Sequence, residues 1–418
     1  MLNPKRKPLT IVIDDQPDNE PESQTVIHIA IQNYQHVLHA NPSYSSLTQD
    51  NERKILLSKG NDYLNQLLEY MESENYLQDL SYQTILQHEA LRNVMQSIFI
   101  NQYDDLNEIK CRDLQTEYTL VKLLTEDQPH KDAQLELSRS LKRNNNRYND
   151  ITPYKYNAVS FKKPATPNTT VNVNVNAVES DNTYFNASYI DGPFKMDEKC
   201  FIATQGPLQS TISKFYQMIY ENDIKLVLML CAFEEEGRKK CEHYLPHQTQ
   251  SELTFNDDNE MKVQLIKEEW VIMNCIVKRE LNIIHNGNAK TVTHIQMLNW
   301  PDHSEPDDYD ASSGWDTLTY LIQLIAETRK MYANIPILLH CSAGTGRTGT
   351  LIAIFNLVKC LYFFKKVNYD QQVKPFFSVF NMVRRLREQR PRMVSSFEQY
   401  VFIYKFIIDF IQKNYNAI

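Results

Sequence analysis

A cysteine and an arginine enclose five small residues in the segment HCSAGTGRTG, residues 340–349. A loop of this length can wrap around one tetrahedral dianion, with the backbone N–H groups of residues 342–347 turned inward. The Arg347 guanidinium would bind two oxygens of the anion, and the Cys341 sulfur would face its central atom. The spacing therefore predicts a phosphate-binding loop with a nucleophile at its base.

The segments on both sides of this loop favour the same interpretation. Residues 335–340 form a strand-like apolar run, and residues 348–365 form a helical one, so the loop precedes a helix N-terminus. Unpaired N–H groups and the helix dipole attract anions at such a terminus. Together with Arg347 they should hold Cys341 as a nucleophilic thiolate at neutral pH.

Other residues of the loop have expected roles of their own. His340 would support Cys341 through its backbone, and the Thr348 hydroxyl would donate to the sulfur when it leaves in a second step. The three glycines permit tight turns and a close approach of the bound group. We expect the anion to be bound by the backbone of Ser342, Ala343, Gly344, Thr345 and Gly346.

Two other interpretations of the loop remain open. Gly344, Gly346 and Gly349 also fit the G-x-G-x-x-G pattern of dinucleotide-binding proteins, with Asp370 about twenty residues further on. That pattern is a weak signal by itself, usually opens its domain, and gives the cysteine and the arginine no role. In the second interpretation, Cys341 is only a buried thiol. Both account for fewer residues than a phosphate-binding loop does.

A second segment supplies the acid that such chemistry requires. A thiolate that attacks a phosphate ester expels an alkoxide or phenoxide, which must be protonated by a general acid. The segment NWPDH, residues 299–303, offers Asp302. Trp300 would anchor a loop that closes over the pocket, delivers the proton and excludes water. Pro-Asp pairs are common in turns, so this prediction depends on the pairing with the cysteine loop.

With these two segments, residues 110–412 resemble the cysteine-dependent protein tyrosine phosphatases. HCSAGTGRTG is similar to the signature loop of that family, and WPDHSEP is similar to its mobile acid loop, with Ser304-Glu305 where Gly-Val is commoner. The resemblance implies an α/β fold with a highly twisted mixed β-sheet flanked by α-helices, and a reaction without a metal or other cofactor. Further segments that resemble the family are NNRYNDITPY, YFNASYIDG, FIATQGPL, EEEGRKKCEHYLP and LREQRPRMV.

The resemblance also implies the roles of the remaining site residues. Tyr148 would form the wall on which a phosphotyrosine ring stacks, in a pocket too deep for the shorter phosphoserine and phosphothreonine. Asp150 would hold the substrate backbone. Glu235 would orient the loop arginine, Lys240 would approach the acid, and Arg387 would support the site.

The clearest departure from the family lies in MVSSFEQY, residues 393–400. The family usually has Gln-Thr where this chain has Ser395-Ser396, and that glutamine positions the water that hydrolyses the cysteinyl-phosphate. Gln399, which matches the second glutamine of the family, is retained. We therefore expect the phosphoenzyme to form normally and to be hydrolysed more slowly, unless Ser395 or Gln399 positions the water.

Strand-like and helical runs indicate a mixed α/β sheet with helices collected toward the C-terminus. The strand-like runs are KLVLML, TVTHIQML and IPILLH, and the helical runs cover residues 314–331, 348–365, 375–389 and 396–413. Residues 162–182 are rich in Asn, Val and Thr, which predicts a surface insertion or an exposed hairpin.

The first quarter of the chain differs from the rest in charge. Residues 1–110 hold eight Lys or Arg and sixteen Asp or Glu, whereas residues 111–418 hold 36 of each sign. Residues 1–50 are polar and rich in proline, which predicts a partly disordered tail. Apolar residues at helical spacing predict a helical extension over residues 51–109. The catalytic domain would then cover residues 110–418.

Three roles are open for the region before the catalytic domain. Its helices can simply pack together. Alternatively, the acidic stretch, with Tyr70, Tyr76 and Tyr103 near acids, would lie across an electropositive pocket mouth and lower activity. In the third, Lys5–Ile13 (KRKPLTIVI) serves as a kinase docking peptide, although such short patterns also arise by chance.

Composition argues against several classes of protein. The seven cysteines include no CxxC pair and no zinc-type spacing, which indicates free thiols in a reducing compartment. No run approaches about 18 consecutive apolar residues, and the N-terminus lacks a signal-peptide core, so we expect an intracellular, cytoplasmic protein without a membrane span. The balanced charge of residues 111–418 and the lack of a nucleic-acid module argue against a nucleic-acid partner.

The predicted function is hydrolysis of phosphotyrosine in protein substrates. Cys341 attacks phosphorus while Asp302 protonates the tyrosine oxygen, and Asp302 then acts as base for the water that releases phosphate. The alternative from another class is a phosphotyrosine-binding pseudophosphatase. Only Ser395 favours it, because Cys341, Asp302 and Arg347 are all present. A phosphoinositide or dual-specificity phosphatase fits less well, since Tyr148 implies a deep pocket.

Overall fold

A computed structural model describes the C-terminal three quarters of the chain, with gaps. The described residues are 118, 121–122, 125–126, 128–161, 184–194, 197–255, 261–306, 313–366 and 379–413. Some predictions therefore fall outside the described residues. These are the tail over 1–50, the helical extension over 51–109 with Tyr70, Tyr76 and Tyr103, the docking peptide Lys5–Ile13 and the insertion over 162–182.

The chain divides into two compact units. The first contains Asp132–Gly349 and Gln389–Ser395, and it holds the β-sheet. The second contains the described parts of Asp14–Lys131, Thr350–Glu388 and Ser396–Ile418, all of them helical or irregular. Helix α12 (Gly346–Lys366) begins in the first unit and continues in the second.

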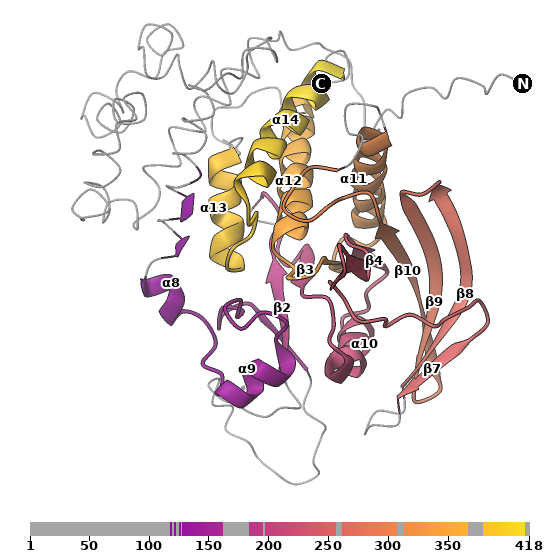
Figure 1. Cartoon of the computed structure of the whole chain (residues 1–418). Helices are drawn as coiled ribbons and strands as arrows, with labels where there is room; N and C mark the ends of the chain where they lie inside the picture. Colours follow the sequence, from indigo (N-terminus) through magenta and orange to yellow (C-terminus); the bar gives the residue numbers. More distant parts are fainter. Residues whose placement is uncertain are drawn as a thin grey trace, which may run out of the picture. The chain divides into compact units, whose positions relative to one another are not determined.

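The first unit is built on a nine-stranded mixed sheet with the order β1-β2-β3-β11-β4-β10-β9-β8-β7 (Figure 1). The central strands β3, β11, β4 and β10 are parallel, and the outer pairs are antiparallel. Strands β5 (Glu234–Glu235) and β6 (Arg238–Lys239) form a separate hairpin. The sheet strands are β1 (Ala158–Ser160), β2 (Tyr184–Ile190), β3 (Phe201–Thr204), β4 (Leu226–Met229), β7 (Glu252–Phe255), β8 (Met261–Ile272), β9 (Ile276–His285), β10 (Asn288–Met297) and β11 (Ile337–His340).

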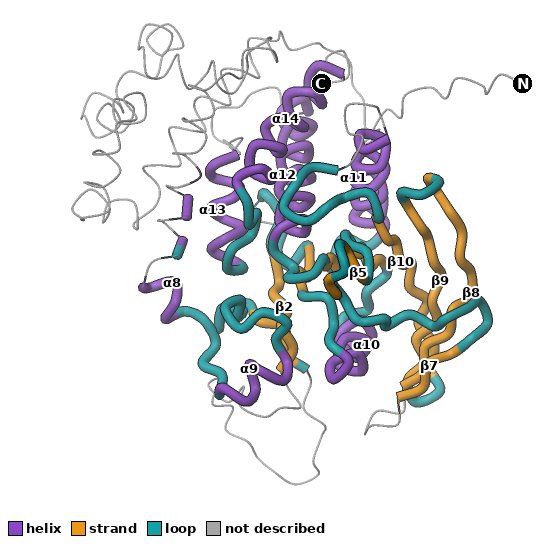
Figure 2. Tube along the Cα trace, viewed as in Figure 1, coloured by secondary structure: helices purple, strands orange, loops and turns teal. Residues whose placement is uncertain are grey.

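The parallel strands in the middle of the sheet are its best-buried part. β4 reads LVLM and β11 reads ILLH, and every residue of both is buried. Continuous apolar runs are typical of parallel strands covered on both faces. By contrast, β8 alternates buried and less buried residues at its start, as a strand with one solvated face does. Figure 2 shows the long strands β8, β9 and β10 side by side.

Helices of the first unit pack on this sheet. α10 (Ile212–Glu221) buries one apolar face, and its Phe215 ring lies 4.9 Å from the Tyr244 ring and 5.7 Å from the His340 ring. α9 (Arg139–Asn145) begins at Ser138, whose Oγ accepts from Leu141 N at 3.1 Å. The remaining helices of this unit are the 3-10 helix η4 (Gln209–Thr211) and α11 (Ser313–Met331). α10 thus supports the strand end from which the signature loop starts.

The second unit contains the greater part of α12, together with α13 (Val379–Gln389) and α14 (Phe397–Lys413). Ring contacts tie it together, such as Tyr118 with Tyr400 at 5.2 Å between centroids. The short helix α8 (Gln128–Asp132) crosses the boundary with the first unit. Within the described part of the chain, none of the helices combines the length and apolar character required to cross a membrane.

The predicted elements agree closely with the observed ones. α11, α12 and α14 begin and end within two residues of the helical runs 314–331, 348–365 and 396–413. α13 ends at the predicted residue, and the predicted positions 375–378 lie outside the described residues. The three strand-like runs contain β4, β11 and most of β10. The α/β fold class is confirmed, whereas the long strands β8 and β9 were not identified because charged runs interrupt their alternation.

Candidate active site

The signature loop connects the buried end of β11 to the first turn of α12. Gly344 has φ of +70°, and a Cβ atom there would lie 2.0 Å from the carbonyl oxygen of Thr204. Only glycine fits such a position. Thr204 ends β3 and is the register partner of His340 in β11. The close approach of these two strand ends therefore sets the curvature of the loop.

Arg390 holds the loop from its other side, and no sequence pattern singled it out. Its buried guanidinium donates to the carbonyl oxygens of Gly344 at 2.8 Å and Ala343 at 3.1 Å. Close by, Val394 N donates to Thr345 O at 3.0 Å. Burial lowers the pKa of Arg390 to about 10, so the group stays cationic at neutral pH. Arg390 therefore fixes the loop backbone and adds positive charge beside it.

Cys341 lies at the base of the loop, 3% exposed, in front of a buried chain of hydrogen bonds. His340 Nδ1 is 3.1 Å from the Cys341 carbonyl oxygen, His340 Nε2 is 2.8 Å from the Tyr244 hydroxyl, and that hydroxyl is 2.7 Å from His294 Nε2. Because a carbonyl oxygen only accepts, His340 carries its proton on Nδ1. Tyr244 then donates to His340 and accepts from His294. Burial lowers the pKa of His340 to about 4, so it is neutral at pH 7.

Arg347 is fully buried at the second residue of α12, and two other loops supply its acceptors. Nη1 donates to Glu235 Oε1 at 2.6 Å and to Trp300 O at 2.7 Å, and Nη2 donates to Glu235 Oε2 at 3.2 Å. Burial alone would lower the pKa of Arg347, but negative charge at Cys341 and Glu235 raises it. Nε is buried without a hydrogen-bond partner among the described residues. Glu235 thus contacts both Nη atoms of Arg347, while Nε has no such acceptor among the described residues.

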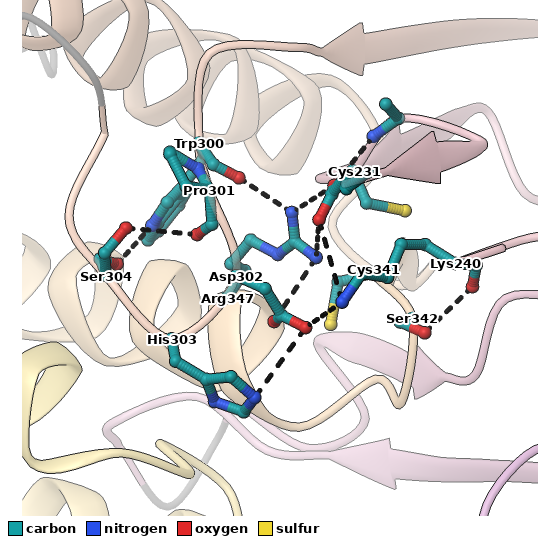
Figure 3. A network of polar contacts seen from close by, with 12 residues as sticks. Cys231, Lys240, Trp300, Pro301, Asp302, His303, Ser304, Cys341, Ser342 and Arg347 are labelled. Carbon is teal, nitrogen blue, oxygen red and sulfur yellow. Dashed lines mark hydrogen bonds and ion pairs between the residues drawn. The ribbon is translucent and has the colours of Figure 1, made fainter. Parts of the chain in front are cut away.

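The Asp302 carboxylate lies between two cations (Figure 3). It accepts from Lys240 Nζ at 2.6 Å and is 3.4 Å from Arg347 Nη2, while His303 Nε2 lies 3.7 Å away. Burial by itself would raise the pKa of Asp302, but Lys240, Arg347 and His303 outweigh it and the pKa is lowered. The predicted approach of Lys240 to the acid is therefore present, and it favours the ionised carboxylate.

A tight turn holds the acid loop in this position. Trp300 is buried, and its Nε1 donates to Ser304 O at 2.8 Å, which closes the turn across Asp302. His303 has φ of +62°, in the left-handed region that non-glycine residues seldom adopt. The Ser304 hydroxyl donates to Glu305 O at 3.1 Å. Trp300 is therefore fixed within the segment that carries Asp302.

Tyr148 stands at the mouth of the site. Ser342 Oγ donates to Lys240 O at 2.9 Å, so the Tyr148 hydroxyl, 3.0 Å away, donates to Ser342 Oγ. The Tyr148 side chain is exposed, and the preceding Arg147 donates to the carbonyl oxygens of Gly206 at 3.0 Å and Pro207 at 2.7 Å. The segment around Tyr148 is therefore fixed next to Ser342, the residue that follows Cys341.

Most predicted site residues come together in the first unit. Those that contact the loop, the acid or each other are Tyr148, Glu235, Lys240, Trp300, Asp302, His340, Cys341, Ser342, Ala343, Gly344, Thr345, Gly346 and Arg347. Thr348 is different. Its Oγ1 is fully buried in the first turn of α12 and has no partner among the described residues, so the predicted bond to the Cys341 sulfur is not formed here.

Three further predicted residues belong to the segments around α13 and α14. Arg387 belongs to the second unit, where it donates to Glu126 Oε1 at 2.8 Å, and the arginine that holds the signature loop is Arg390. Ser395 is half-buried in the first unit, and Gln399 is buried in the second. The remaining residue, Asp150, forms an ion pair at the mouth of the site.

Comparison with known proteins identifies the family. The family model described as Protein-tyrosine phosphatase matches residues 142–409, which include Cys341, Arg347 and Asp302. The chain belongs to the protein-tyrosine phosphatase family. Its membership confirms the resemblance seen in the signature and acid loops.

Individual phosphatases match most of the described chain. Mouse receptor-type tyrosine-protein phosphatase eta is 32% identical over 301 residues, which cover 71% of this chain and 21% of that protein. The rat protein named phosphatidylinositol phosphatase PTPRQ is 29% identical over 323 residues, covering 77% of this chain and 12% of that protein. Both matches span about a fifth or less of the relative's length.

A solved structure shows the same fold. The catalytic domain of human protein tyrosine phosphatase non-receptor type 18 has 28% identity and a TM-score of 0.56, and the match covers 72% of this chain and 96% of that one. The same phosphatase has been solved in complex with HER2-pY1248 phosphopeptides.

Proposed function

We propose that this chain is an active protein tyrosine phosphatase, which hydrolyses phosphotyrosine in proteins through a cysteinyl-phosphate on Cys341. The observation that carries the proposal is the state of Arg347. Glu235 fixes its Nη atoms, while its buried Nε has no partner among the described residues, at the loop that holds the cysteine. A buried donor of this kind is costly unless a ligand satisfies it. A phosphoryl group has both the charge and the oxygen atoms to do so.

The rest of the loop supports binding of the phosphoryl group. The N–H groups of residues 342–347 and the N-terminus of α12 would supply further donors and positive potential. Arg390 adds a second buried guanidinium against the loop carbonyls. A dianion bound here is held with its phosphorus facing Cys341.

In the first step the Cys341 thiolate attacks phosphorus. An S–P bond forms, the bond between phosphorus and the tyrosine oxygen breaks, and Asp302 gives its proton to that oxygen. Asp302 must therefore be protonated, although its cationic neighbours lower its pKa in this structure. A phosphate dianion competes for Arg347 and brings negative charge close to Asp302, and both effects raise the pKa of the carboxyl group. Substrate binding thus favours the protonated form of Asp302 that the first step requires.

In the second step water attacks the phosphocysteine. Asp302, now ionised, takes a proton from the water, the S–P bond breaks, and inorganic phosphate leaves with the thiolate restored. Ser395 stands where the resemblance implies a water-positioning glutamine. We propose that this step is the slower one, and that Ser395→Gln accelerates it.

Phosphotyrosine is the substrate that fits the mouth of the site best. Tyr148 lies beside Ser342, the residue that follows the nucleophile, so an aryl phosphate that reaches Cys341 can stack on the Tyr148 ring. Complexes of the non-receptor type 18 phosphatase with phosphopeptides support a peptide substrate. A phosphoinositide is the second candidate, because one relative is named a phosphatidylinositol phosphatase.

The test is hydrolysis of three substrates by the full chain. These are a phosphotyrosine peptide, the same peptide with phosphoserine, and a short-chain phosphoinositide, with Cys341→Ser as the inactive control. We expect phosphate release from the phosphotyrosine peptide alone, and its loss in the control. Preference for the phosphoinositide would replace the proposal with a lipid phosphatase. Tight binding of the phosphotyrosine peptide without any release would replace it with a pseudophosphatase.

A further inference from the structure

Asp150 and Arg392 form an ion pair at the mouth of the active site, and nothing in the catalytic steps uses it. Asp150 Oδ2 accepts from Arg392 Nη1, and the two side chains are 59% and 44% exposed. The residues come from segments 242 positions apart in the sequence. Their pairing joins the recognition segment after α9 to the segment that follows α13.

Both partners are held at the mouth by their neighbours. On one side, Tyr148 donates to Ser342 Oγ, two residues before Asp150. On the other, Arg390 donates to the carbonyl oxygens of the signature loop, two residues before Arg392. Each member of the ion pair is thus tied, through a residue two positions away, to the loop that carries the nucleophile. The pair therefore keeps its place relative to a bound phosphotyrosine.

The backbone at Arg392 is unusual for an arginine. Its φ is +62°, in the left-handed region that glycine and asparagine occupy more readily. The fully buried Arg390 and the bond from Val394 N to Thr345 O fix the chain on both sides of it. The fold therefore determines the position of the Arg392 guanidinium.

An ion pair this exposed is weak and exchanges partners easily. The guanidinium has several N–H donors that can bind any nearby carboxylate, so Arg392 can exchange Asp150 for a second carboxylate. While Arg392 holds Asp150, it competes with the substrate backbone for the carboxylate. A carboxylate brought in by the substrate would take over Arg392 and leave Asp150 to accept a backbone N–H group.

We propose that Arg392 is a specificity-determining residue that favours phosphotyrosines with an acidic residue next to them in the peptide. The inference rests on the proposed function, and it adds a preference that the catalytic residues do not set. A flanking Glu engages Arg392 and frees Asp150. A flanking Lys is repelled by Arg392, and the ion pair stays closed.

The test compares three phosphotyrosine peptides that differ only in the residue next to the phosphotyrosine, which is Glu, Gln or Lys. A second set places the change on the other side of the phosphotyrosine. For the wild-type chain we expect kcat/KM to be about 5- to 10-fold higher with Glu than with Lys in at least one set. The ratio should shrink when ionic strength is raised from about 0.05 M to about 0.5 M, because the side chains are exposed.

Arg392→Gln gives the decisive result. It should lower kcat/KM for the Glu peptide and raise it for the Lys peptide, because removal of the guanidinium releases Asp150 for every substrate. Damage to the site would lower both. Arg392→Glu should reverse the preference. Lys262→Gln is the matched control, since Lys262 pairs with Glu252 at 3.8 Å on the β7–β8 edge with comparable exposure, and it should keep the Glu-to-Lys ratio of the wild type.

Binding to Cys341→Ser separates this inference from the catalytic proposal. If the wild type releases no phosphate but the variant binds the Glu peptide more tightly than the Lys peptide, catalysis fails as a proposal and the role of Arg392 stands. If the wild type hydrolyses all peptides equally, the role of Arg392 is refuted and the phosphatase proposal stands. Absence of both hydrolysis and binding overturns the two together.

Discussion

The loop that carries Cys341 and the loop that carries Asp302 are held by different kinds of contact. The signature loop is held in place by contacts of buried backbone atoms. Gly344 packs on the carbonyl of Thr204, and Arg390 donates to two loop carbonyls. The acid loop depends on side-chain ion pairs, in which Asp302 is held by Lys240 and Arg347.

This difference matches what each loop has to do. Close backbone approach and buried hydrogen bonds allow one geometry, as a site that must surround an anion requires. Asp302 is held only through its side chain, which is 26% exposed, so it can leave its ion-pair partners without disturbing buried backbone, as the proposed closure of the acid loop over substrate would require. Arg347 belongs to both regions, because it lies in the signature loop and contacts Asp302. The comparison predicts that changes in the first loop cost more than changes around the second.

Arg347→Lys should have the largest effect. A lysine cannot hold both Glu235 oxygens and still offer a planar donor to phosphate. We expect kcat/KM for p-nitrophenyl phosphate to fall about 10³-fold. Arg279→Lys is the control, because Arg279 pairs with Glu268 on the sheet, and its activity should stay close to that of the wild type. A fall of less than tenfold in kcat/KM for Arg347→Lys would contradict the role proposed for the planar guanidinium of Arg347.

Gly344→Ala tests whether backbone contact fixes the signature loop. The new Cβ would meet the Thr204 carbonyl at 2.0 Å in a left-handed conformation, and we expect the free energy of unfolding to drop by about 3 kcal/mol. Gly287→Ala is matched in backbone, with φ of +76°, but has open space around it. It should cost only about 1 kcal/mol. Equal losses in urea unfolding of the two variants would show that the close approach does not matter.

The buried histidine behind the nucleophile predicts a pH effect on stability. The pKa of His340 falls from 6.5 to about 4 on burial, so protons bind the unfolded chain more strongly. The contribution of neutral His340 to the free energy of unfolding is fully present above pH 6.5 and is lost as the pH falls toward 4. Between pH 7 and pH 4.5 this amounts to about 2–3 kcal/mol. The free energy of unfolding of His340→Gln should change less between these two pH values than that of the wild type, by the same amount. If the free energies of the two proteins changed in parallel with pH, the lowered pKa of His340 would be refuted.

Lys240→Gln should have the smallest effect, confined to the acid loop. Lys240 donates the strongest of the contacts that lower the pKa of Asp302, so its removal should raise that pKa. The alkaline limb of the pH profile of kcat/KM, where the acid loses its proton, should therefore move to higher pH. A limb that stays in place would mean that Lys240 does not control the acid. Unchanged thermal unfolding at pH 7 would show that the signature loop is intact.

Sequence patterns were most informative where chemistry and backbone are local. Cys341, Arg347 and the glycines lie within ten residues, so spacing alone indicates a loop around a dianion. The helices α11, α12 and α14 could be predicted because their apolar periodicity extends over four turns or more. Asp302 could be identified only with a second motif and with the argument that the reaction needs a general acid.

Contacts between distant segments could not be predicted in the same way. VRRLREQRPR contains five arginines, and no spacing shows that Arg390 is the one that reaches the loop. The chain from His340 through Tyr244 to His294 joins residues that are 96 and 50 positions apart. Each looks like an ordinary buried residue in its own segment. The Asp150–Arg392 pair was missed for the same reason, since only the fold brings its members together.

The most direct test of the account is rapid mixing of the chain with an excess of a phosphotyrosine peptide. Dephosphorylated peptide and free phosphate are measured separately from milliseconds to seconds, and quenched protein is examined for a phosphate adduct on the peptide that contains Cys341. We predict a burst of about one dephosphorylated peptide per chain, an adduct on Cys341 and slower release of phosphate. We also expect Ser395→Gln to speed the slow phase and Cys341→Ser to abolish the burst. Steady release with no adduct, retained in Cys341→Ser, would contradict a cysteinyl-phosphate mechanism.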